Sequence, residues 1–339
     1  MRRFVPQRVF FEPTALSYPL GQQLEEKFKN MGIPIEFTTS HNRVTGIPGN
    51  TAREKYVQAK RSLVVGVRRT LRFAPCKPSA HYQLPLVTSC PGLCEYCYLQ
   101  TTLGPKPINR IYVNVEEILG QAEQNIKDRE PEITVFEGAA TSDPIPVEYL
   151  TGSLRRTIEF FAGQELGRFR FVTKFSDIDS LLDIVHNNHT EVRFSLNTES
   201  VINEYERGTA SAQDRINAAK KIAQAGYPLG FLIAPIVIYP EWKRQYAELI
   251  STLRDSLPGG ARPKFELITH RFTARAKKNI EAVFPGSTLP MNEEERQFKY
   301  GQFGYGKYVY PKDTMEEIEE FFRQELEVHF PEVEIAYLV

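Results

Sequence analysis

Residues 83–97 read QLPLVTSCPGLCEYC and place a short apolar strand directly before three closely spaced cysteines. Cys90, Cys94 and Cys97 have the spacing C-x3-C-x2-C, with a proline and a glycine between the first two. Proline and glycine disfavour a regular helix, so we expect a loop on which the three thiols converge on one object. Three soft thiolate ligands at this spacing are typical of a metal or iron–sulfur site.

The chain beyond this stretch alternates between short apolar segments and segments with helical spacing. The apolar segments, typical of buried parallel strands, lie at residues 83–88, 133–137, 169–175, 192–197, 228–235 and 264–268. The helical patterns lie at residues 115–127, 153–162, 177–185, 213–225 and 241–256. Successive strand–helix units predict a parallel sheet closed wholly or partly into a barrel. Alternation alone also fits an open doubly wound sheet, and the cysteines at a strand end favour the barrel.

Shorter patterns flank the repeat on both sides. The residues before it predict a small α/β extension, and those after it predict an aromatic hairpin, a charged helix and a short strand. These elements lie at residues 8–12, 20–30, 35–38, 298–310, 313–327 and 333–338. We therefore expect an α/β fold: an N-terminal α/β extension over 1–78, a partial (β/α)6 TIM-type barrel over 79–270, and a C-terminal hairpin and helix region over 271–339.

The composition is that of an ordinary globular protein. The chain has 339 residues, of which 41% are hydrophobic and 25% charged. It has only four cysteines, which excludes a disulfide scaffold and indicates a reducing compartment. No apolar run reaches the roughly 18 residues of a membrane span. The N-terminus lacks the apolar segment of a signal peptide, so we expect a cytoplasmic protein.

The zero net charge conceals an uneven distribution of charge. Residues 53–77 hold eight basic side chains and one acidic, whereas residues 312–339 hold nine acidic and two basic. Such asymmetry indicates a face for a polyanion and a solvated acidic tail. Arg68, Arg69 and Arg72 are candidates for contacts with a nucleic acid backbone, although weaker ones than the hairpin residues discussed below. A solvated helix face is the alternative interpretation of the basic run.

Several kinds of site use clustered cysteines. A structural zinc site needs four ligands, often as two C-x2-C pairs, and this chain has no second pair. His81 or Cys76 would have to complete such a site. A ferredoxin-type carrier normally supplies four cysteines, whereas three leave one iron of a [4Fe–4S] cluster free to bind something else.

The cysteine motif, with Tyr96 just before its last member, resembles the signature of the radical SAM superfamily. That resemblance implies a [4Fe–4S] cluster at Cys90, Cys94 and Cys97. It also implies S-adenosylmethionine (SAM) as a second cofactor, bound through the free iron and cleaved by one electron to a 5′-deoxyadenosyl radical.

Five segments together resemble the spore photoproduct lyase family within that superfamily. They are the late hairpin and residues 90–101 (CPGLCEYCYLQT), 137–144 (EGAATSDP), 173–175 (TKF) and 195–197 (SLN). The resemblance implies a lyase that repairs spore photoproduct, 5-thyminyl-5,6-dihydrothymine, in DNA. The radical would abstract hydrogen from C6, the bridge between the thymines would break, and a hydrogen atom would return. A poorly stacked lesion costs less to extrude into a pocket than a normal base pair.

The resemblance also implies roles for individual side chains. The residues expected to hold SAM lie at strand ends: Ser142, Lys174, Ser195, Asn197 and Ala234. Ordinary exposure in a loop is the alternative for Lys174 and Ser195. Tyr96 and Tyr98, which flank Cys97, are expected near the radical, with packing of the loop as the alternative.

The hairpin supplies the expected contacts with DNA. Tyr305 would wedge the duplex, while Lys299 and Lys307 would neutralise phosphates. A hairpin whose aromatic residues serve packing alone is the competing interpretation.

The chain departs from the family pattern at one position. The family carries a cysteine within the segment 137–142 that is thought to return the hydrogen atom, and the matching residue here is Ala140. Alanine has no S–H bond, so we expect impaired hydrogen return in a natural or engineered variant. Cys76 is the only cysteine outside the cluster motif.

The expected partners follow from this chemistry. They are DNA containing spore photoproduct and a reductant such as flavodoxin or ferredoxin, with no membrane and a monomeric state. Two alternatives remain at this point. One is a radical SAM enzyme acting on another nucleic acid or on a peptide, and the other is a zinc-stabilised nucleic-acid-binding protein without catalysis.

Overall fold

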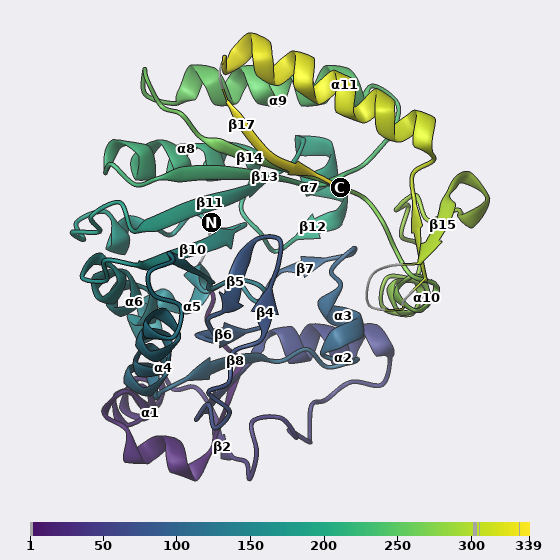
Figure 1. Cartoon of the computed structure of the whole chain (residues 1–339). Helices are drawn as coiled ribbons and strands as arrows, with labels where there is room; N and C mark the ends of the chain where they lie inside the picture. Colours follow the sequence, from purple (N-terminus) through teal and green to yellow (C-terminus); the bar gives the residue numbers. More distant parts are fainter. Residues whose placement is uncertain (1–2, 301–303, 305, 332) are drawn as a thin grey trace.

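The computed structural model of the chain describes residues 3–300, 304, 306–331 and 333–339. Two β-sheets form its main body, with helices on the outside (Figure 1). The larger sheet has eight strands in the order β17-β14-β13-β11-β10-β9-β5-β4. Their bounds are β4 (Pro75–Cys76), β5 (Ala80–Gln83), β9 (Thr134–Glu137), β10 (Gly167–Thr173), β11 (Thr190–Leu196), β13 (Leu229–Ile236), β14 (Lys264–Thr269) and β17 (Glu334–Leu338).

The larger sheet is a partial barrel, as the alternating pattern predicts. Its strands pair in parallel throughout, except for the edge strand β4, which is antiparallel to β5. Within the described residues the edges β4 and β17 do not pair with each other, so the sheet stays open. The helices around its outer face are α4 (Val115–Lys127), α5 (Ile145–Thr151), α6 (Ser153–Ala162), α8 (Ala212–Gln224), α9 (Trp242–Ser256) and α11 (Lys312–His329) (Figure 1).

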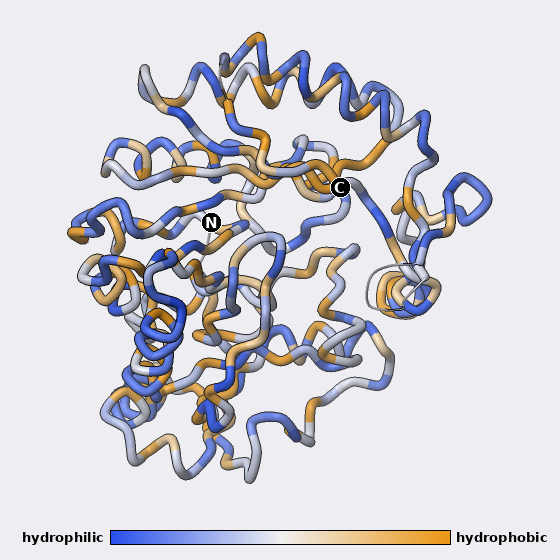
Figure 2. The backbone as a smooth tube through the Cα atoms, in the orientation of Figure 1, coloured by the Kyte–Doolittle hydropathy of each residue, from blue (hydrophilic) through white to orange (hydrophobic). Residues whose placement is uncertain are grey.

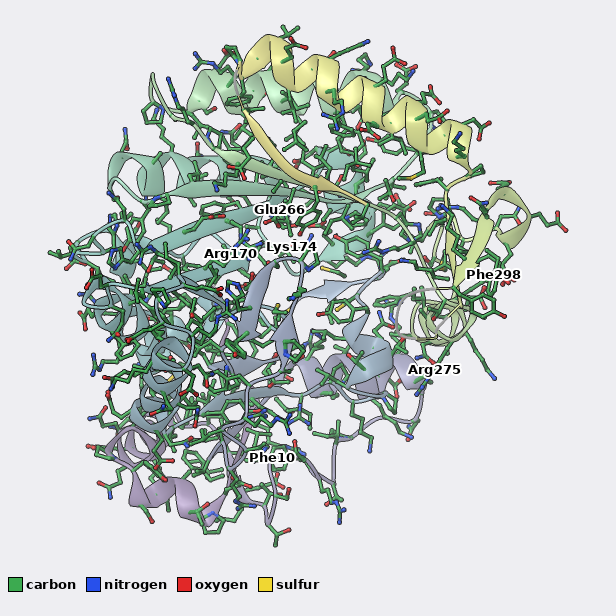
Figure 3. All side chains as sticks on the ribbon, in the orientation of Figure 1. Phe10, Arg170, Lys174, Glu266, Arg275 and Phe298 are labelled. Carbon is green, nitrogen blue, oxygen red and sulfur yellow. The ribbon has the colours of Figure 1, made fainter. Side chains whose placement is uncertain are left out.

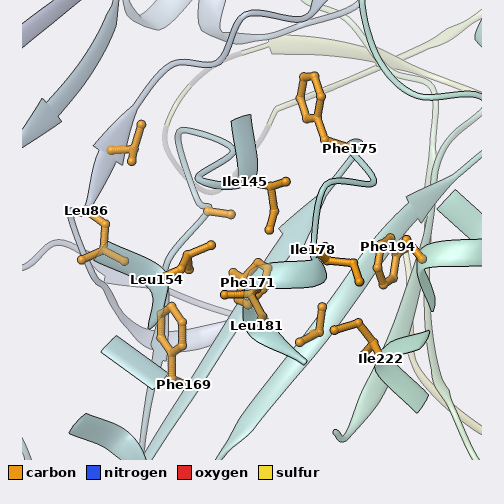
Figure 4. Packing of buried hydrophobic residues seen from close by; sticks show 14 of the residues in the cluster. Leu86, Ile145, Leu154, Phe169, Phe171, Phe175, Ile178, Leu181, Phe194 and Ile222 are labelled. Atoms are coloured by element: carbon orange, nitrogen blue, oxygen red, sulfur yellow. The ribbon is translucent and has the colours of Figure 1, made fainter. Parts of the chain in front are cut away.

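The two faces of this sheet differ in chemistry. Phe169 and Phe171 of β10 point toward the helices, where Phe169 stacks on Phe161 of α6 with ring centroids 5.5 Å apart (Figure 4). Successive side chains of a strand alternate between faces, so Arg170 points into the barrel. Apolar residues gather between sheet and helices, while charged residues lie along the exposed helix faces (Figure 2).

A smaller sheet completes the body. Its strands, in order, are β2 (Ile35–Phe37), β1 (Arg8–Phe11), β3 (Ser62–Gly66), β8 (Asn109–Tyr112) and β6 (Val87–Thr88). The expected single strand at 83–88 is wrong, because the chain leaves β5 of the barrel at Gln83 and pairs as β6 with this second sheet. Pro85 lies at the break and has no N–H for a ladder. The division at residue 78 stays a proposal, since β6 and β8 complete the sheet that the N-terminal residues begin.

The expected helix at 177–185 is also wrong. Only the 3-10 turn Asp179–Leu181 forms there. Neighbouring side chains take the carbonyls that a helix would have used: the Tyr227 hydroxyl donates to Leu181 O at 2.7 Å, and Arg155 donates to Ser180 O at 2.9 Å. Tertiary contacts therefore override the helical spacing of this segment.

The remaining elements flank the two sheets. The predicted hairpin forms as β15 (Gln297–Tyr300) and β16 (Gly306–Val309). The other helices are α1 (Pro19–Asn30), α2 (Ala52–Lys60), α3 (Leu99–Thr102), α7 (Glu199–Tyr205) and α10 (Ala274–Val283), and short 3-10 turns lie at Pro13–Ser17 and Glu293–Glu295. Among the described residues, no helix has the length and apolar character needed to cross a bilayer.

Candidate active site

A cavity of about 480 Å³ opens where the barrel strands end. Every strand from β9 to β14 contributes to its wall at or just after its carboxyl end, the usual position of sites in such barrels. Its lining includes Cys90, Cys94, Cys97, Tyr96, Tyr98, Ala140, Ser142, Lys174, Ser195, Ala234 and His270. The fold therefore gathers all but one of the expected cluster, SAM and radical-site residues around one space, the exception being Asn197.

The cysteine loop is fixed by a short two-stranded ladder. Strand β7 (Leu93–Cys94) pairs antiparallel with β12 (Glu206–Arg207), so Cys94 lies opposite Glu206. A side chain in place of the Gly92 hydrogen would put its Cβ 3.6 Å from Cys90 Sγ and 3.8 Å from Cys94 Sγ. Glycine thus leaves free the space between two thiols.

The cysteine loop supplies three soft thiol ligands, and a [4Fe–4S] cluster held by three cysteines keeps one iron free for another ligand. All three thiols line the cavity, and Gly92 places no side chain between Cys90 and Cys94. Within the described ranges, no three His, Cys, Asp or Glu side chains are arranged to hold one metal ion. The chemistry of the three cysteines therefore fits an iron–sulfur cluster.

A buried ionic network lies against this loop. Lys174 Nζ is 2.7 Å from Glu206 Oε1 and 2.8 Å from the Tyr96 hydroxyl. The Tyr96 hydroxyl donates to the same carboxylate, and Arg215 Nη2 lies 2.6 Å from its other oxygen. Burial opposes ionisation of Glu206, but the cations of Arg215 and Lys174 outweigh it and hold the Glu206 pKa at about 2. Glu206 thus orients the Lys174 ammonium at the cavity wall.

Asp143 fixes the neighbouring strand end. Its carboxylate accepts hydrogen bonds from Thr173 Oγ1 at 2.9 Å, from the Lys174 backbone N–H at 2.8 Å and from the Ile145 N–H at 3.2 Å. Burial nevertheless raises the Asp143 pKa to about 6. Asp143 therefore sets the backbone from which Lys174 projects.

The expected SAM-contacting residues fall into two groups. Ser142, Ser195 and Ala234 line the cavity, and the Ala234 carbonyl accepts from Lys174 Nζ at 3.3 Å and from Ser195 Oγ at 3.4 Å. Asn197 does not line it. The Asn197 amide donates to Pro235 O at 2.7 Å and accepts from the Tyr246 hydroxyl at 2.7 Å. Asn197 therefore supports the strand end behind Ala234.

The position at which the resemblance predicts a cysteine faces the cavity. Ala140 lines it, and its carbonyl accepts a hydrogen bond from the Tyr98 hydroxyl. Cys76, on the edge strand β4, is half-buried, and burial raises its pKa to about 11. A negative charge on Cys76 would raise the Tyr98 pKa, so the two side chains lie within electrostatic reach of each other.

The hairpin carries a cationic face beside the cavity mouth. Lys299 and Lys307 lie directly opposite each other on β15 and β16. Phe272, just after β14, bridges to Tyr308, and this antiparallel register puts the Arg271 side chain on the same face as Lys307. Arg271 also lines the cavity. Lys299, Lys307 and Arg271 are named here the cationic face; none of them pairs with a carboxylate in the described part of the chain.

The opposite face of the hairpin is aromatic. Phe298 packs on both Tyr300 and Tyr308, with ring centroids 5.2 Å apart in each case, and it projects outward (Figure 3). Phe298 is 49% exposed and Tyr300 80% exposed. Packing therefore does not account for all of these aromatic side chains. Tyr305, the expected wedge, lies outside the described residues.

The N-terminal arginines are partly engaged within the protein. Arg68 Nε donates to Thr70 O at 3.0 Å, and Arg69 lies 3.5 Å from Glu12. Arg72 is exposed. The acidic C-terminal run forms α11, whose carboxylates make surface ion pairs such as Lys243–Glu317. This run is therefore a solvated helix face.

Comparison with known proteins identifies the family. Residues 4–339 match the family described as spore photoproduct lyase. A spore photoproduct lyase of Clostridium acetobutylicum is 50% identical over 333 residues, covering 98% of each chain. That of Bacillus subtilis is 50% identical over 336 residues, again covering 98% of each. The chain belongs to the spore photoproduct lyase family. It is therefore a lyase, which excludes a binding protein without catalysis.

Solved structures of spore photoproduct lyases share the whole fold. One is a variant with bound AdoMet and dinucleoside spore photoproduct, with a TM-score of 0.97, 51% identity and full coverage of both chains. That variant has alanine in place of cysteine at its position 140 and cysteine in place of serine at its position 76. Another structure, complexed with dinucleoside spore photoproduct, has a TM-score of 0.97 and 50% identity.

Sequence reasoning missed several residues of this spore photoproduct lyase site. Glu206, Arg215 and Arg271 lie outside the quoted motifs, whereas Asp143 lies within the segment 137–144 and was assigned no role there. Arg215 gave a signal, because Ala212, Ala219 and Ile222 lie three, four and seven residues from it and share its face of the helical pattern. A charged residue on a buried helix face requires a buried partner.

Proposed function

We propose that this lyase reverts spore photoproduct in DNA to two thymines, using a [4Fe–4S] cluster and SAM. The observation that carries the proposal is the cavity at one end of a partial barrel, whose lining brings together three cysteines, Lys174 and Arg271 of the cationic face. When bound, the cluster and SAM supply a 5′-deoxyadenosyl radical that abstracts hydrogen from C6 of the lesion.

Each side chain then has a stated task. Cys90, Cys94 and Cys97 ligate the cluster. Lys174, oriented by Glu206, neutralises the SAM carboxylate, while Ser142, Ser195 and the backbone at Ala234 contact the rest of the cofactor. Asn197 positions that backbone through Pro235.

The apolar character of the remaining lining suits a flipped-out thymine dimer. Leu99, Val172, Leu232 and Ile268 form walls against which the bases pack and from which water is displaced. Lys299 and Lys307 are proposed to contact phosphates at the mouth, and Tyr305 to wedge the duplex.

The hydrogen-return step needs a donor other than Ala140. We propose Cys76, with Tyr98 between it and the cavity. Its raised pKa keeps it as the thiol, the form that carries an S–H bond. A related lyase was studied with alanine and cysteine at its positions 140 and 76, the pair of residue types found at these numbers here. If Cys76 does not act, the chain is impaired in hydrogen return, as Ala140 alone suggests.

The function is tested by anaerobic reconstitution with iron and sulfide, reduction, and incubation with SAM and a lesion-containing oligonucleotide. We expect brown protein that forms 5′-deoxyadenosine and restores two intact thymines in the strand. The Cys94→Ala variant should lose the charge-transfer absorption and both products. Colourless protein with one stoichiometric zinc, or 5′-deoxyadenosine formed without thymine from this lesion, contradicts the proposal.

The donor is tested by comparing thymine yields from three variants. Cys76→Ser should lower the clean yield at least about tenfold while leaving 5′-deoxyadenosine formation intact. Ala140→Cys in the Cys76→Ser background should restore it, because position 140 lines the cavity and would supply a thiol there. An unchanged yield in Cys76→Ser rules out Cys76. A poor yield in the parent that rises on Ala140→Cys alone supports impairment instead.

Three further points complete the proposal. The electron comes from a small donor such as flavodoxin or ferredoxin, the lyase acts as a monomer, and it works in the cytoplasm of the spore or germinating cell. Residues 1–78, 79–270 and 271–339 are proposed as the extension, barrel and hairpin-bearing units.

A further inference from the structure

Helix α2 presents two buried polar side chains to the cysteine loop. Tyr56 and Lys60 lie four residues apart, so they share one face of the helix. Tyr56 is 0% exposed and Lys60 is 1% exposed. Neither belongs to the barrel, and neither is explained by the site described above.

Lys60 reaches the first cysteine of the motif. Its Nζ donates to the Cys90 carbonyl at 2.8 Å and lies 3.3 Å from Ser89 Oγ. The centroid of the Tyr56 ring lies 5.6 Å from the same nitrogen. Among the described residues no carboxylate pairs with Lys60. A lysine this buried normally has an anionic partner, because burying an uncompensated ammonium is costly.

Tyr56, like Lys60, has a buried polar group that lacks its usual partner. Its hydroxyl is buried without any hydrogen-bond partner. The ring packs in a small apolar cluster with Phe284 and with Leu93 and Tyr96 of the cysteine loop. Negative charge on Cys97, Cys94 and Cys90 adds to burial in raising the Tyr56 pKa, so its hydroxyl lies within electrostatic reach of all three sulfurs. A buried donor without an acceptor needs an explanation, such as a group that binds there.

We propose that α2 forms the outer wall of the cluster site, with the Tyr56 hydroxyl donating to a cluster sulfur and the Lys60 ammonium balancing the cluster's negative charge. The inference rests on the proposed function, which places the cluster in this loop. Hydrogen bonds to sulfur and nearby positive charge favour the more negative, reduced state of an iron–sulfur cluster. Tyr56 and Lys60 are therefore positioning residues that make the cluster easier to reduce.

The same contacts indicate that the N-terminal extension supports the cysteine loop. Helix α2 leads directly into β3 of the smaller sheet, so Lys60 ties that sheet to Cys90. Ser89, just before Cys90, has a positive φ of 66°, a backbone conformation that a non-glycine residue rarely adopts. Hydrogen bonds from Lys60 to both residues hold the chain in this conformation at the entrance to the loop.

Tyr56→Phe is the sharpest test, because it removes only the hydroxyl. In the cluster-free protein the thermal midpoint should stay the same or rise, since an unsatisfied buried group is lost. In the reconstituted protein the midpoint potential, followed by EPR during a redox titration, should become more negative. We expect about a tenfold fall in the one-electron reduction constant, the loss of one charge-assisted hydrogen bond, which corresponds to about 59 mV.

Lys60→Met should shift the potential in the same direction and lower the iron retained after reconstitution, whereas Lys60→Arg keeps the charge and should retain the parent's potential. Tyr227→Phe is the matched tyrosine control, because its hydroxyl bonds Leu181 O far from the loop. It should lower the thermal midpoint without moving the potential. Lys55→Met, on the same helix, is the lysine control and should change neither the potential nor the iron retained after reconstitution.

The outcomes separate the inference from the proposed function. Parent protein that takes up no iron and sulfide overturns both. Parent protein with a cluster, but with equal potentials in Tyr56→Phe and Lys60→Met, overturns the role of α2 alone. A lower potential in both variants, with the parent's value in Lys60→Arg, supports it.

Discussion

The barrel interior and the hairpin at its mouth are both rich in cationic side chains. In the described part of the chain, those of the barrel pair with carboxylates and those of the hairpin's cationic face do not. Inside the barrel, Arg193 and Arg170 reach across the strands to Glu137, Glu266 and Glu191. Arg170 and Glu266 are labelled in Figure 3. The Arg193 Nη1 to Glu266 Oε2 distance is 2.9 Å, and both side chains are buried. These ion pairs lie on the sheet face that also carries Val172 and Ser195 of the cavity lining.

On the hairpin the cations face one another. Lys299 lies opposite Lys307, and like charges in this cross-strand position destabilise a sheet. Burial and the charges of Arg271 and Lys299 lower the Lys307 pKa. The difference teaches that paired charges hold the barrel together, whereas the hairpin cations have no carboxylate partner in the described part of the chain and are proposed to bind phosphate.

The largest expected effect follows from removing one cation of the ion-paired barrel interior. Arg193→Met leaves Glu137 and Glu266 with less compensation in a buried site and should destabilise the protein by about 3–5 kcal/mol. Urea denaturation followed by circular dichroism measures this. Arg323→Met, which removes an exposed i,i+4 pair, should cost under about 0.5 kcal/mol. Equal losses in the two variants would contradict the structural importance of the interior network.

A second prediction concerns a barrel carboxylate that lacks a cation. Glu148 accepts the backbone N–H groups of Leu154 and Arg155, and burial raises its pKa to about 7. Its contribution to stability is therefore complete below about pH 4.5 and is lost as the pH rises through about 7.

Glu148→Gln should remove that dependence. The loss of stability between pH 5 and 8 should shrink in the variant by up to about 3 kcal/mol. Urea midpoints measured across this range give the slope, whatever the variant costs at a single pH. A slope identical to the parent's would show that Glu148 does not titrate in this range.

The smallest effect on stability belongs to the hairpin. Replacing Lys299 and Lys307 together by glutamine should leave the thermal midpoint unchanged or slightly higher, because a like-charge pair disappears. Affinity for a lesion-containing duplex should fall, and the slope of log K against log salt should decrease by about 1.8. Fluorescence anisotropy over a series of salt concentrations measures both. A lower midpoint with unchanged binding would reverse the contrast between the two regions.

Much of the barrel follows from local sequence pattern, because its strands are short and its helices strongly amphipathic. The helices at 115–127 and 153–162 lie where the spacing predicts them. Patterns fail where a distant side chain decides the backbone, as Tyr227 and Arg155 do for residues 177–185.

The candidate site divides in the same way. The spacing of Cys90, Cys94 and Cys97 predicts that they form a site, and the position of Lys174 at a strand end predicts that it belongs to that site. Glu206 and Lys60 act through contacts between segments that no local pattern reveals. Net charge gave no guidance, because the cations that matter are those left unpaired by the fold.

The break at Pro85 has a mechanical consequence. The chain enters the cysteine loop from β6 of the smaller sheet, and the loop is held on its other side by β12 of the barrel region. The three thiols thus span a seam between two sheets. In the cluster-free protein, the reaction of these thiols with a thiol-reactive dye therefore reports the opening of either pairing, β6 with β8 or β7 with β12.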